Sequence, residues 1–466
     1  MLKACRNESR AMKAAGMVLA AAILLPAQPA APPAEMTVAQ AVEAALRNYP
    51  SIRVTQEQMN AAAAGIRLAQ TAYLPRVDGL LQVNRASRNT FYGMLLPQSV
   101  IPGVDGVKAD NFGSVFDSGA GVLVAWQPFD FGLRRANVAA ATATRDQAQA
   151  ALNRTRYEVS VATADAFLTA IAARQTAEAA RAAVDSWQVL ARSIHALVNA
   201  QLRPGADESR VQAELALAQT QVAQAEQAVE VARATLSEFV GLDPAQVSLN
   251  PARLLETAPE GPEAPFSAAG NPLAREQTAA IAQQQSRLDA LGRTDYPQFL
   301  VQGMASGRGS GVETDGARLG GLNGLVPTVP NYGVGLTVTF PAMDRFATRE
   351  REAMQAANIR AQEAQSQTIA AKLRAQFNTA LATLSGARKV AANTTVAVSS
   401  GHAAVEQATA RYRSGLAPID DVAQAQRLLV QAQIDDALAR LGVWRARLQV
   451  ATARGDIQPF LDEAVR

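Results

Sequence analysis

The residue types that most often catalyse reactions or bind metals are few in this sequence, and they are poorly placed for either role. The chain has two histidines and one cysteine, and His195 and His402 each lie inside a long helix-forming stretch. The acidic pairs Asp420-Asp421 and Asp435-Asp436 occupy neighbouring helix positions, whose side chains point in different directions. No glycine-rich phosphate loop opens a helix after a strand, and the serines near 306 and 310 lack a nearby histidine. We therefore expect no enzyme activity, no metal site and no cofactor.

The composition favours long, thin helical elements over thick globular cores. Hydrophobic residues make up 48% of the chain but aromatic residues only 5%, and alanine supplies much of the apolar content. Alanine buries little area per residue, so it suits close seams between helices. Charged residues reach 18%, and apolar residues recur periodically, which argues against disorder. A single cysteine excludes a disulfide scaffold and a cysteine-based metal site.

The first thirty residues have the pattern of a secretory signal. Four basic residues precede an apolar run from Ala14 to Leu25, and a stretch rich in proline and alanine follows. The run is too short to span a bilayer as a helix, which takes about 20 residues. We predict cleavage near Ala27 to Ala34. Cys5 would leave with the signal, so no lipid anchor is expected.

The mature chain would carry no net charge. The precursor has 44 basic and 41 acidic residues, and residues 1–30 hold four of the basic residues and one of the acidic residues. The remainder is 40 of each sign, which offers no obvious basic face. We therefore expect no nucleic acid partner.

The sequence contains an internal duplication. Pro50 and Pro75 bracket a helix-forming stretch of the same length as the one between Pro272 and Pro297. Further pairs are Trp126-Gln127-Pro128-Phe129-Asp130 with Thr339-Phe340-Pro341-Ala342-Met343-Asp344, and Leu202-Arg203-Pro204-Gly205 with Arg413-Ser414-Gly415-Leu416. We divide the chain into a signal peptide (1–30), a first repeat (31–240), a proline-rich linker (241–270), a second repeat (271–454) and a C-terminal segment (455–466).

Each repeat is expected to contain a helix, two strands and a long helical hairpin. Residues 133–201 have no proline or glycine, and at about 1.5 Å per residue such a helix would extend roughly 100 Å. Residues 345–413 repeat this pattern, broken only by Gly386 and Gly401. The return helices are expected over 211–240 and 422–453, after turns that contain Pro204-Gly205 and Gly415 to Pro418.

Four segments alternate between apolar and polar residues, as transmembrane β-strands do. They lie at about 76–86, 118–128, 298–307 and 331–341. An ordinary half-buried sheet is the alternative, but the signal peptide and the missing core favour the membrane. Four strands cannot close a barrel, and an open edge is not tolerated in lipid. Several copies must therefore combine their strands, and three copies, with twelve strands, are the fewest that enclose a passage.

Several short stretches resemble the TolC-like outer membrane efflux family. They are Met36 to Pro50, Tyr73-Leu74-Pro75, Tyr412-Arg413-Ser414-Gly415, and Asp421-Val422 followed by Gln424-Ala425-Gln426. No single motif is specific, but their duplicated order covers essentially the whole mature chain. The resemblance implies a homotrimer with one 12-stranded β-barrel in outer-membrane lipid and one α-helical barrel in the periplasm. The loops near 89–115 and 311–329 would face outside, and the linker and C-terminal segment would surround the waist.

The resemblance also implies an exit duct for multidrug efflux or type I secretion. Its hairpin turns would meet a periplasmic adaptor that joins an inner-membrane transporter. The matching positions are Leu202, Arg203, Pro204, Gly205, Ser414, Gly415 and Leu416.

The family closes the periplasmic end with acidic rings and polar ties between helices. Asp421 falls on one aspartate of this gate, whereas Gln424 stands where the second carboxylate is expected, and Tyr412 matches a tyrosine of the ties. The acidic partner of Tyr412 on the first hairpin stays open between Asp207 and Glu208. Three carboxylates around a narrow axis repel one another and attract cations. The alternative for Asp421 is a helix N-terminal carboxylate that the helix dipole stabilises.

The sequence offers two alternatives to an exit duct. A soluble periplasmic coiled-coil scaffold or adaptor would have a small β-domain, but adaptors usually contain one hairpin, whereas here hairpins and strand pairs occur twice. A diffusion porin needs many strands per chain, and only four are seen.

Overall fold

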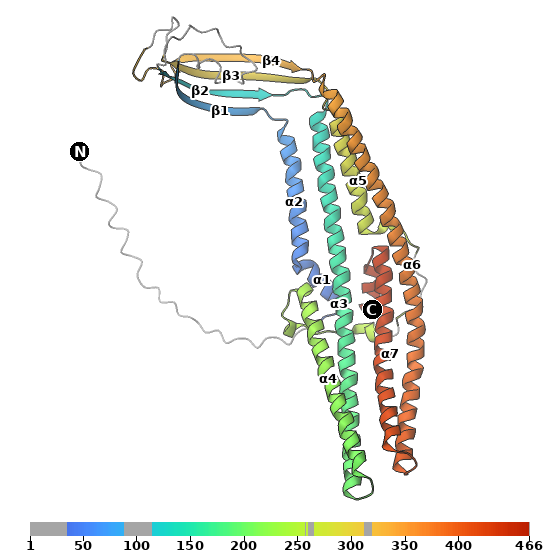
Figure 1. Cartoon of the computed structure of the whole chain (residues 1–466). Helices are drawn as coiled ribbons and strands as arrows, with labels where there is room; N and C mark the ends of the chain where they lie inside the picture. The colour runs from blue at the N-terminus through green and yellow to red at the C-terminus, as the bar shows by residue number, and fades with distance from the viewer. Residues whose placement is uncertain (1–34, 88–113, 257, 260–264, 312–318, 466) are drawn as a thin grey trace, which may run out of the picture.

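The computed structural model describes residues 35–87, 114–256, 258–259, 265–311 and 319–465. It confirms the expected mainly α-helical fold with a small β part: long helices run side by side, and a four-stranded sheet projects from one end of them (Figure 1). The expected signal peptide and most of the two expected loops between strands lie outside the described residues. No helix among the described residues is both long enough and apolar enough to cross a membrane.

The elements follow the expected order in each repeat. The first repeat holds α1 (Val38–Asn48), α2 (Pro50–Thr71), β1 (Arg76–Ser87), β2 (Ser114–Trp126), α3 (Leu133–Asn199) and α4 (Gly205–Val240). The second holds α5 (Pro272–Leu291), β3 (Gln298–Ser310), β4 (Val329–Thr339), α6 (Asp344–Arg413) and α7 (Ile419–Arg454). Three short 3-10 turns, η2 (Pro244–Gln246), η3 (Ala252–Leu255) and η4 (Ala268–Gly270), lie in the linker, and α8 (Gln458–Val465) lies in the C-terminal segment.

Two very long hairpins dominate the molecule. Helix α3 has 67 residues and α6 has 70, and α6 continues through both of its glycines. A Cβ atom added at Gly401 would lie 3.2 Å from the Leu429 Cα atom of α7, so glycine allows a close approach there. The return helices begin earlier than expected, because Pro204 and Pro418 take the N-cap positions of α4 and α7. Proline is acceptable there, since the N–H that it lacks would have no partner inside the helix.

Polar caps and prolines also fix where the shorter helices start. Thr37 and Gln40 form a capping box at α1, in which each side chain bonds the backbone N–H of the other. Helices α2 and α5 both carry proline at the first position, and the Asn271 side chain accepts a hydrogen bond from the Leu273 N–H at 3.0 Å. Tyr49-Pro50 and Asn271-Pro272 are therefore helix starts.

The sheet has the order β1-β2-β3-β4, and every neighbouring pair is antiparallel. Strands β2 and β4 end at Trp126 and Thr339, earlier than the expected 128 and 341, because Pro128 and Pro341 cannot donate to the ladder. Strand β3 runs to Ser310, three residues beyond the expected end.

The register places most of the large apolar side chains of the four strands on one face. Val77 pairs with Val124, and Val301 pairs with both Trp126 and Leu336. The exposed large apolar side chains of this face are Val77, Leu81, Val83, Val122, Val124, Trp126, Tyr332, Val334, Leu336 and Val338. We call it the apolar sheet face. The opposite face carries most of the polar side chains, such as Asp78, Gln82 and Asn331.

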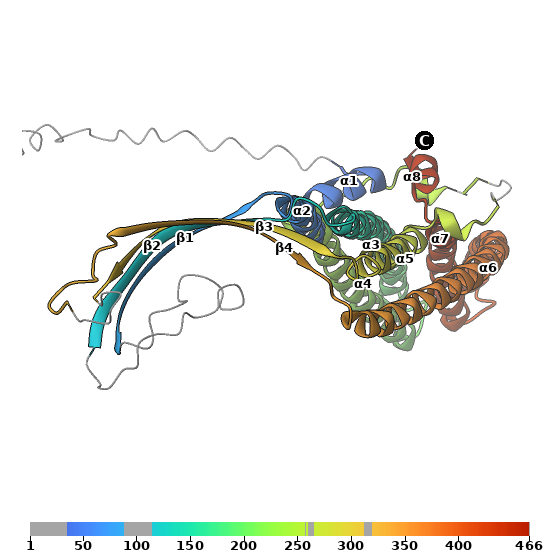
Figure 2. The same cartoon turned by 90° about the horizontal axis from the view of Figure 1, so that it is seen from above.

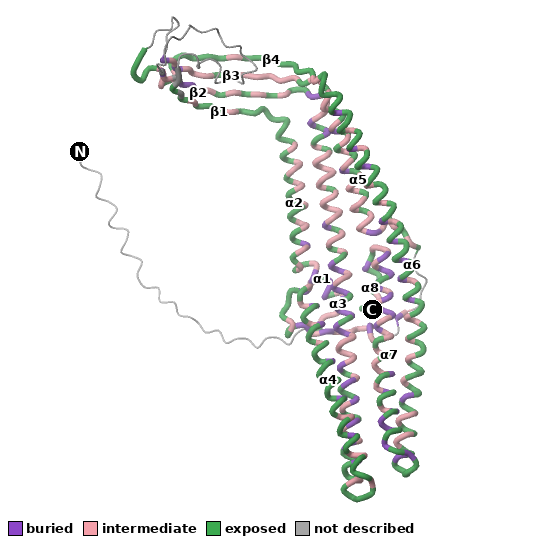
Figure 3. Tube along the Cα trace, viewed as in Figure 1, coloured by how far each residue is buried: buried purple, intermediate pink, exposed green. Residues whose placement is uncertain are grey.

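The main core lies at the waist, halfway along the helices, where α1, α8 and the linker pack against α3 and α7 (Figures 1 and 3). Viewed from above, α1 and α8 lie together on one side of the long helices, and the sheet is curved (Figure 2). Trp444 is fully buried in this core and donates a hydrogen bond from its Nε1 to the Glu256 carbonyl at 3.2 Å. The hydroxyl of Tyr157 lies 2.8 Å from the Thr452 carbonyl, and burial raises its pKa.

Candidate functional site at the hairpin tips

The turns of both hairpins lie at the end of the molecule opposite the sheet (Figure 1). The two helices that lead into them end in the same way. Gln201 and Gly415 adopt positive φ values of 59° and 76°, and the next residue donates its N–H back to a carbonyl five positions earlier. These residues are Leu202 and Leu416, whose side chains are 69% and 73% exposed. Each hairpin therefore presents one exposed leucine at its tip.

Tyr412 is the centre of contact between the two tips. Its side chain is buried, and its hydroxyl donates a hydrogen bond to Asp207 Oδ2 at 2.9 Å. The Arg203 guanidinium lies 4.3 Å from the centre of the Tyr412 ring and also donates to the Tyr412 carbonyl oxygen. Burial raises the pKa of Tyr412 to about 12, and the Asp207 carboxylate acts in the same direction. The phenol thus stays protonated and joins α6 to α4. Asp207 is the acidic partner that the sequence left open.

Two ion pairs continue this seam away from the tips. Arg210 of α4 pairs with Asp420 of α7. Further from the tips, Glu214 of α4 pairs with Arg427 of α7 at 3.3 Å. The charges alternate in sign along each helix, so the hairpins match in only one register. Our sequence reasoning did not identify these pairs. The signal was present in the seven-residue spacing from Arg203 to Arg210, from Asp207 to Glu214 and from Asp420 to Arg427.

An apolar cluster lies under these polar contacts. Trp187 and Ile194 of α3, Val211 of α4, and Ile419 and Val422 of α7 are each less than 5% exposed. This cluster unites the two hairpins. The polar seam therefore fixes the register of a contact that burial of apolar area already favours.

Asp421 and Gln424 are placed differently from the residues of the seam. Both are exposed on α7, three residues apart and so on neighbouring positions of one helix face. Among the described residues neither side chain has a hydrogen-bonding or ion-pair partner. Asp421 lies in the first turn of α7 but does not accept a hydrogen bond from a helix N–H. The capping alternative is thus reduced to the attraction of the helix dipole.

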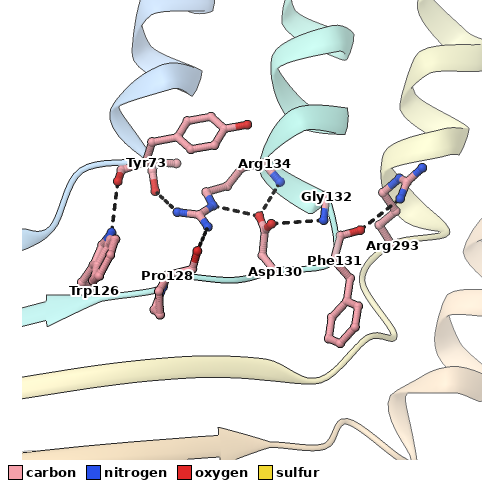
Figure 4. A network of polar contacts seen from close by, with 9 residues as sticks. Tyr73, Trp126, Pro128, Asp130, Phe131, Gly132, Arg134 and Arg293 are labelled. Atoms are coloured by element: carbon pink, nitrogen blue, oxygen red, sulfur yellow. Dashed lines mark hydrogen bonds and ion pairs between the residues drawn. The ribbon is translucent and has the colours of Figure 1, made fainter.

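A second polar network lies at the other end of α3, where the chain leaves the sheet (Figure 4). The Asp130 carboxylate accepts hydrogen bonds from the Arg134 N–H at 2.6 Å, the Arg134 Nε at 2.9 Å and the Gly132 N–H at 3.1 Å. Burial opposes ionisation of Asp130, but these hydrogen bonds outweigh it and hold the pKa of Asp130 below its ordinary value. The Arg134 guanidinium also donates to the Ala72 and Pro128 carbonyls and faces the Tyr73 ring at 4.8 Å.

The two histidines serve local contacts. His195 Nδ1 lies 2.7 Å from Glu208 Oε1, and His195 Nε2 lies 3.0 Å from the Asn199 side chain. His402 Nε2 lies 3.5 Å from the Gln433 side chain. Within the described ranges, no three His, Cys, Asp or Glu residues gather in a way that could hold a metal ion.

Residues 41–242 and 267–456 match the outer membrane efflux protein family, and the chain belongs to that family. The two matched segments leave out residues 243–266, which lie within the predicted linker. Membership decides against the scaffold and porin alternatives and supports the role of an exit duct.

Individual proteins resemble the chain in sequence or in fold. The chain is 26% identical to Protein CyaE of Bordetella pertussis over 350 residues, which are 72% of this chain and 67% of that protein. It superposes on the CmeC outer membrane channel of Campylobacter jejuni with a TM-score of 0.70 and 15% identity, over 92% of this chain and 89% of that one. For the outer membrane protein VceC of Vibrio cholerae the TM-score is 0.70 at 16% identity, over 90% and 96% of the two chains.

Proposed function

We propose that three copies of this chain form a continuous exit duct in the bacterial outer membrane, with the long helices in the periplasm. The duct would receive its cargo from a periplasmic adaptor and an inner-membrane transporter. The observation that carries this proposal is the apolar sheet face, which is exposed in an isolated chain of an outer membrane efflux family.

The sheet supports the number of copies. Within the described residues β1 and β4 each have a single neighbouring strand, so each presents an unpaired edge. Such edges are costly in lipid and disappear only when a barrel closes. Pairing β4 of one copy with β1 of the next removes all edges at once, and three copies supply twelve strands.

The most direct test changes the two faces of one strand. Val334 is 85% exposed on the apolar sheet face, and Asn331 lies on the opposite face of β4. An arginine facing lipid costs about 2–4 kcal/mol near the bilayer midplane. We expect Val334→Arg to lower the amount of detergent-extracted trimer recovered from outer membranes, whereas Asn331→Arg leaves it nearly unchanged. A chain that is recovered from the aqueous fraction as a monomer would contradict the proposal.

The hairpin tips would form the periplasmic entrance. In a trimer the exposed Asp421 side chains would form a ring of three carboxylates, and Gln424 would add a ring of uncharged amides. Such a ring attracts cations and repels anions. The exposed Leu202 and Leu416 at the tips would be available to the adaptor, together with Arg203, Pro204, Gly205, Ser414 and Gly415.

The contacts of Tyr412 would hold this entrance closed, because α6 and α7 cannot move away from α4 while the Asp207 and Arg203 contacts persist. Single-channel recording of the purified trimer tests both parts. Asp421→Asn should reduce cation preference and block by divalent cations, with Asp435→Asn on the same helix as the matched control. Tyr412→Phe should raise the conductance of the resting channel. Unchanged traces for both variants would remove the gate from the proposal.

A further inference from the structure

A hollow of about 1240 Å³ lies between α3, α5 and α6 at the sheet end of the helices. We call it the junction hollow. Its charged lining residues come from three helices: Arg135 from α3, Asp289 and Arg293 from the end of α5, and Arg349 and Glu352 from α6. Three arginines and two acidic residues thus line the hollow, and one positive charge remains in excess.

The arginines of the hollow are available to a ligand. In the part of the chain that the structure describes, Arg135 and Arg349 form no ion pair and no hydrogen bond through their side chains. Arg293 uses one nitrogen, Nη1, to donate to the Phe131 carbonyl at 3.0 Å, and this contact holds its guanidinium at the rim (Figure 4). Its remaining N–H groups are free to donate. Guanidinium groups match the planar oxygen pairs of phosphate and carboxylate, so arginine is the preferred partner of such anions.

Two glycines leave room for charged side chains over the backbone of the hollow. A Cβ atom at Gly132 would lie 3.2 Å from Arg293 Nη1, and one at Gly292 would lie 3.1 Å from Glu352 Oε1. Side chains at these positions would crowd the charged groups. The absence of side chains at Gly132 and Gly292 therefore helps to shape the hollow.

One wall of the hollow is aromatic. The rings of Phe131 and Tyr296 are stacked, with their centres 5.2 Å apart and their planes inclined by 23°. Both residues line the hollow. Phe131 lies in the segment between β2 and α3, and Tyr296 lies in the segment between α5 and β3. Flat apolar rings next to convergent charged groups suit a ligand that has an apolar body and one anionic group.

We propose that the junction hollow binds an amphiphilic anion. Its phosphate or carboxylate group lies among the three arginines, and its apolar part lies against the two stacked rings. This chemistry has two sources, a membrane lipid with an anionic headgroup and a soluble anionic amphiphile. The site is separate from the hairpin tips and does not depend on the gate.

The first arm of the test uses dodecyl phosphate, titrated by calorimetry into the purified protein in an uncharged detergent. Arg135→Gln with Arg349→Gln should weaken binding tenfold or more, because each lost charge-assisted hydrogen bond contributes substantially. The matched control is Arg351→Gln with Arg360→Gln, which removes the same charge from exposed positions of α6 outside the hollow. Glu352→Gln should tighten binding, since it removes a competing carboxylate.

The second arm identifies the source. The same variants are placed in phosphatidylcholine nanodiscs that contain some phosphatidylglycerol, and the lipid retained after extraction is measured by mass spectrometry. Loss of phosphatidylglycerol from the hollow variant alone assigns the site to lipid. Equal retention, with the calorimetric difference still present, assigns it to a soluble amphiphile. Equal dodecyl phosphate binding by wild type, hollow variant and control overturns the proposal, provided that circular dichroism shows all three to be folded.

Discussion

The two places where the chain passes from the sheet into a long helix have the same motif order but different environments. In the first repeat Asp130 and Arg134 are both buried, and Arg134 reaches the carbonyl at the end of α2. In the second repeat Asp344 is exposed, and the position that corresponds to Arg134 is the buried Thr348. At the first junction the charged side chains are buried by contacts within the chain, whereas at the second junction the aspartate stays exposed.

The neighbours of α3 and α6 explain this difference. Helix α3 contacts both α2 and α5, whereas α6 contacts α5 near the sheet and its other main neighbour, α7, lies further from the sheet (Figure 1). The free side of α6 exposes Met343 and Phe346, at 78% and 71%. We expect this side to be covered by another copy of the chain, so the second junction would be completed by assembly. A buried charge pair is tolerated at the first junction, because hydrogen-bonding partners for both charges are present within the same chain.

The strongest test of this comparison removes the buried cation. Arg134→Met leaves the Asp130 carboxylate buried without its partner and should lower the free energy of unfolding by about 3–5 kcal/mol. Asp344→Asn at the second junction should change it by less than about 0.5 kcal/mol, since the side chain is exposed. Urea unfolding in detergent, followed by helical circular dichroism, gives both values. Similar losses for the two variants would show that the junctions do not differ.

A substitution on the exposed side of α6 should have the next largest effect, which is on the stability of the trimer. If a second copy covers Phe346, Phe346→Ala should weaken the trimer by about 1.5–3 kcal/mol per chain, the usual contribution of a buried phenylalanine. The measurement is the trimer fraction on heating in detergent. Met354→Ala, also exposed but further along α6, serves as a comparison that tells how far the covering extends. No change in the trimer fraction for Phe346→Ala would mean that this side stays free.

At the tips the two repeats differ in the contacts of one arginine near each turn. Arg203→Ala should cost about 1–2 kcal/mol, because it removes both the contact with the Tyr412 ring and the hydrogen bond to its carbonyl. Arg413, at the end of α6, is exposed and should be replaceable by alanine at almost no cost. Thermal unfolding of the two variants side by side checks this, and equal stability would indicate that the ring contact contributes nothing.

The smallest effects are expected at the two turns. Gly415→Ala should destabilise by about 1 kcal/mol, because a left-handed conformation is unfavourable for a residue with a Cβ atom. Gln201 already accepts this conformation, so Gln201→Gly should stabilise by a few tenths of a kcal/mol. Opposite signs in thermal unfolding would confirm that the turns are equivalent in geometry, and equal signs would contradict it.

The elements of this fold could be predicted largely from the sequence, because their signals are local. Proline and glycine mark the helix ends, and alternation marks the strands. The misplaced ends have local causes as well: Pro128 and Pro341 end their strands early, and Pro204 and Pro418 begin their helices early. Helix α8 was not expected, because its eight residues are too few to show a clear period.

The contacts of the candidate site could be predicted only in part. Tyr412 was identified, but the choice of Asp207 over Glu208 depends on how the two tips face each other. In the structure Glu208 contacts His195 of α3, whereas Asp207 contacts Tyr412 of α6. Asp130 and Arg134 are four residues apart, but the contact of Arg134 with Ala72 and the junction hollow both join residues far apart in sequence, which no local period predicts. Arg135 and Arg349, for example, are separated by most of the first hairpin, the linker, α5 and the second pair of strands.

The first and last described helices share one core. Val38 and Val42 of α1 lie in the same buried cluster as Phe460, Leu461 and Ala464 of α8, and the two helices contact each other. Helix α1 precedes both long hairpins in the sequence and α8 follows them, so the waist core is complete only when both helices are in place. A chain that stops before Gln458 would leave apolar alanine and valine side chains of the waist core uncovered, and the waist would then be accessible to proteases. The waist core thus links the two ends of the helical region, and its stability depends on both of them.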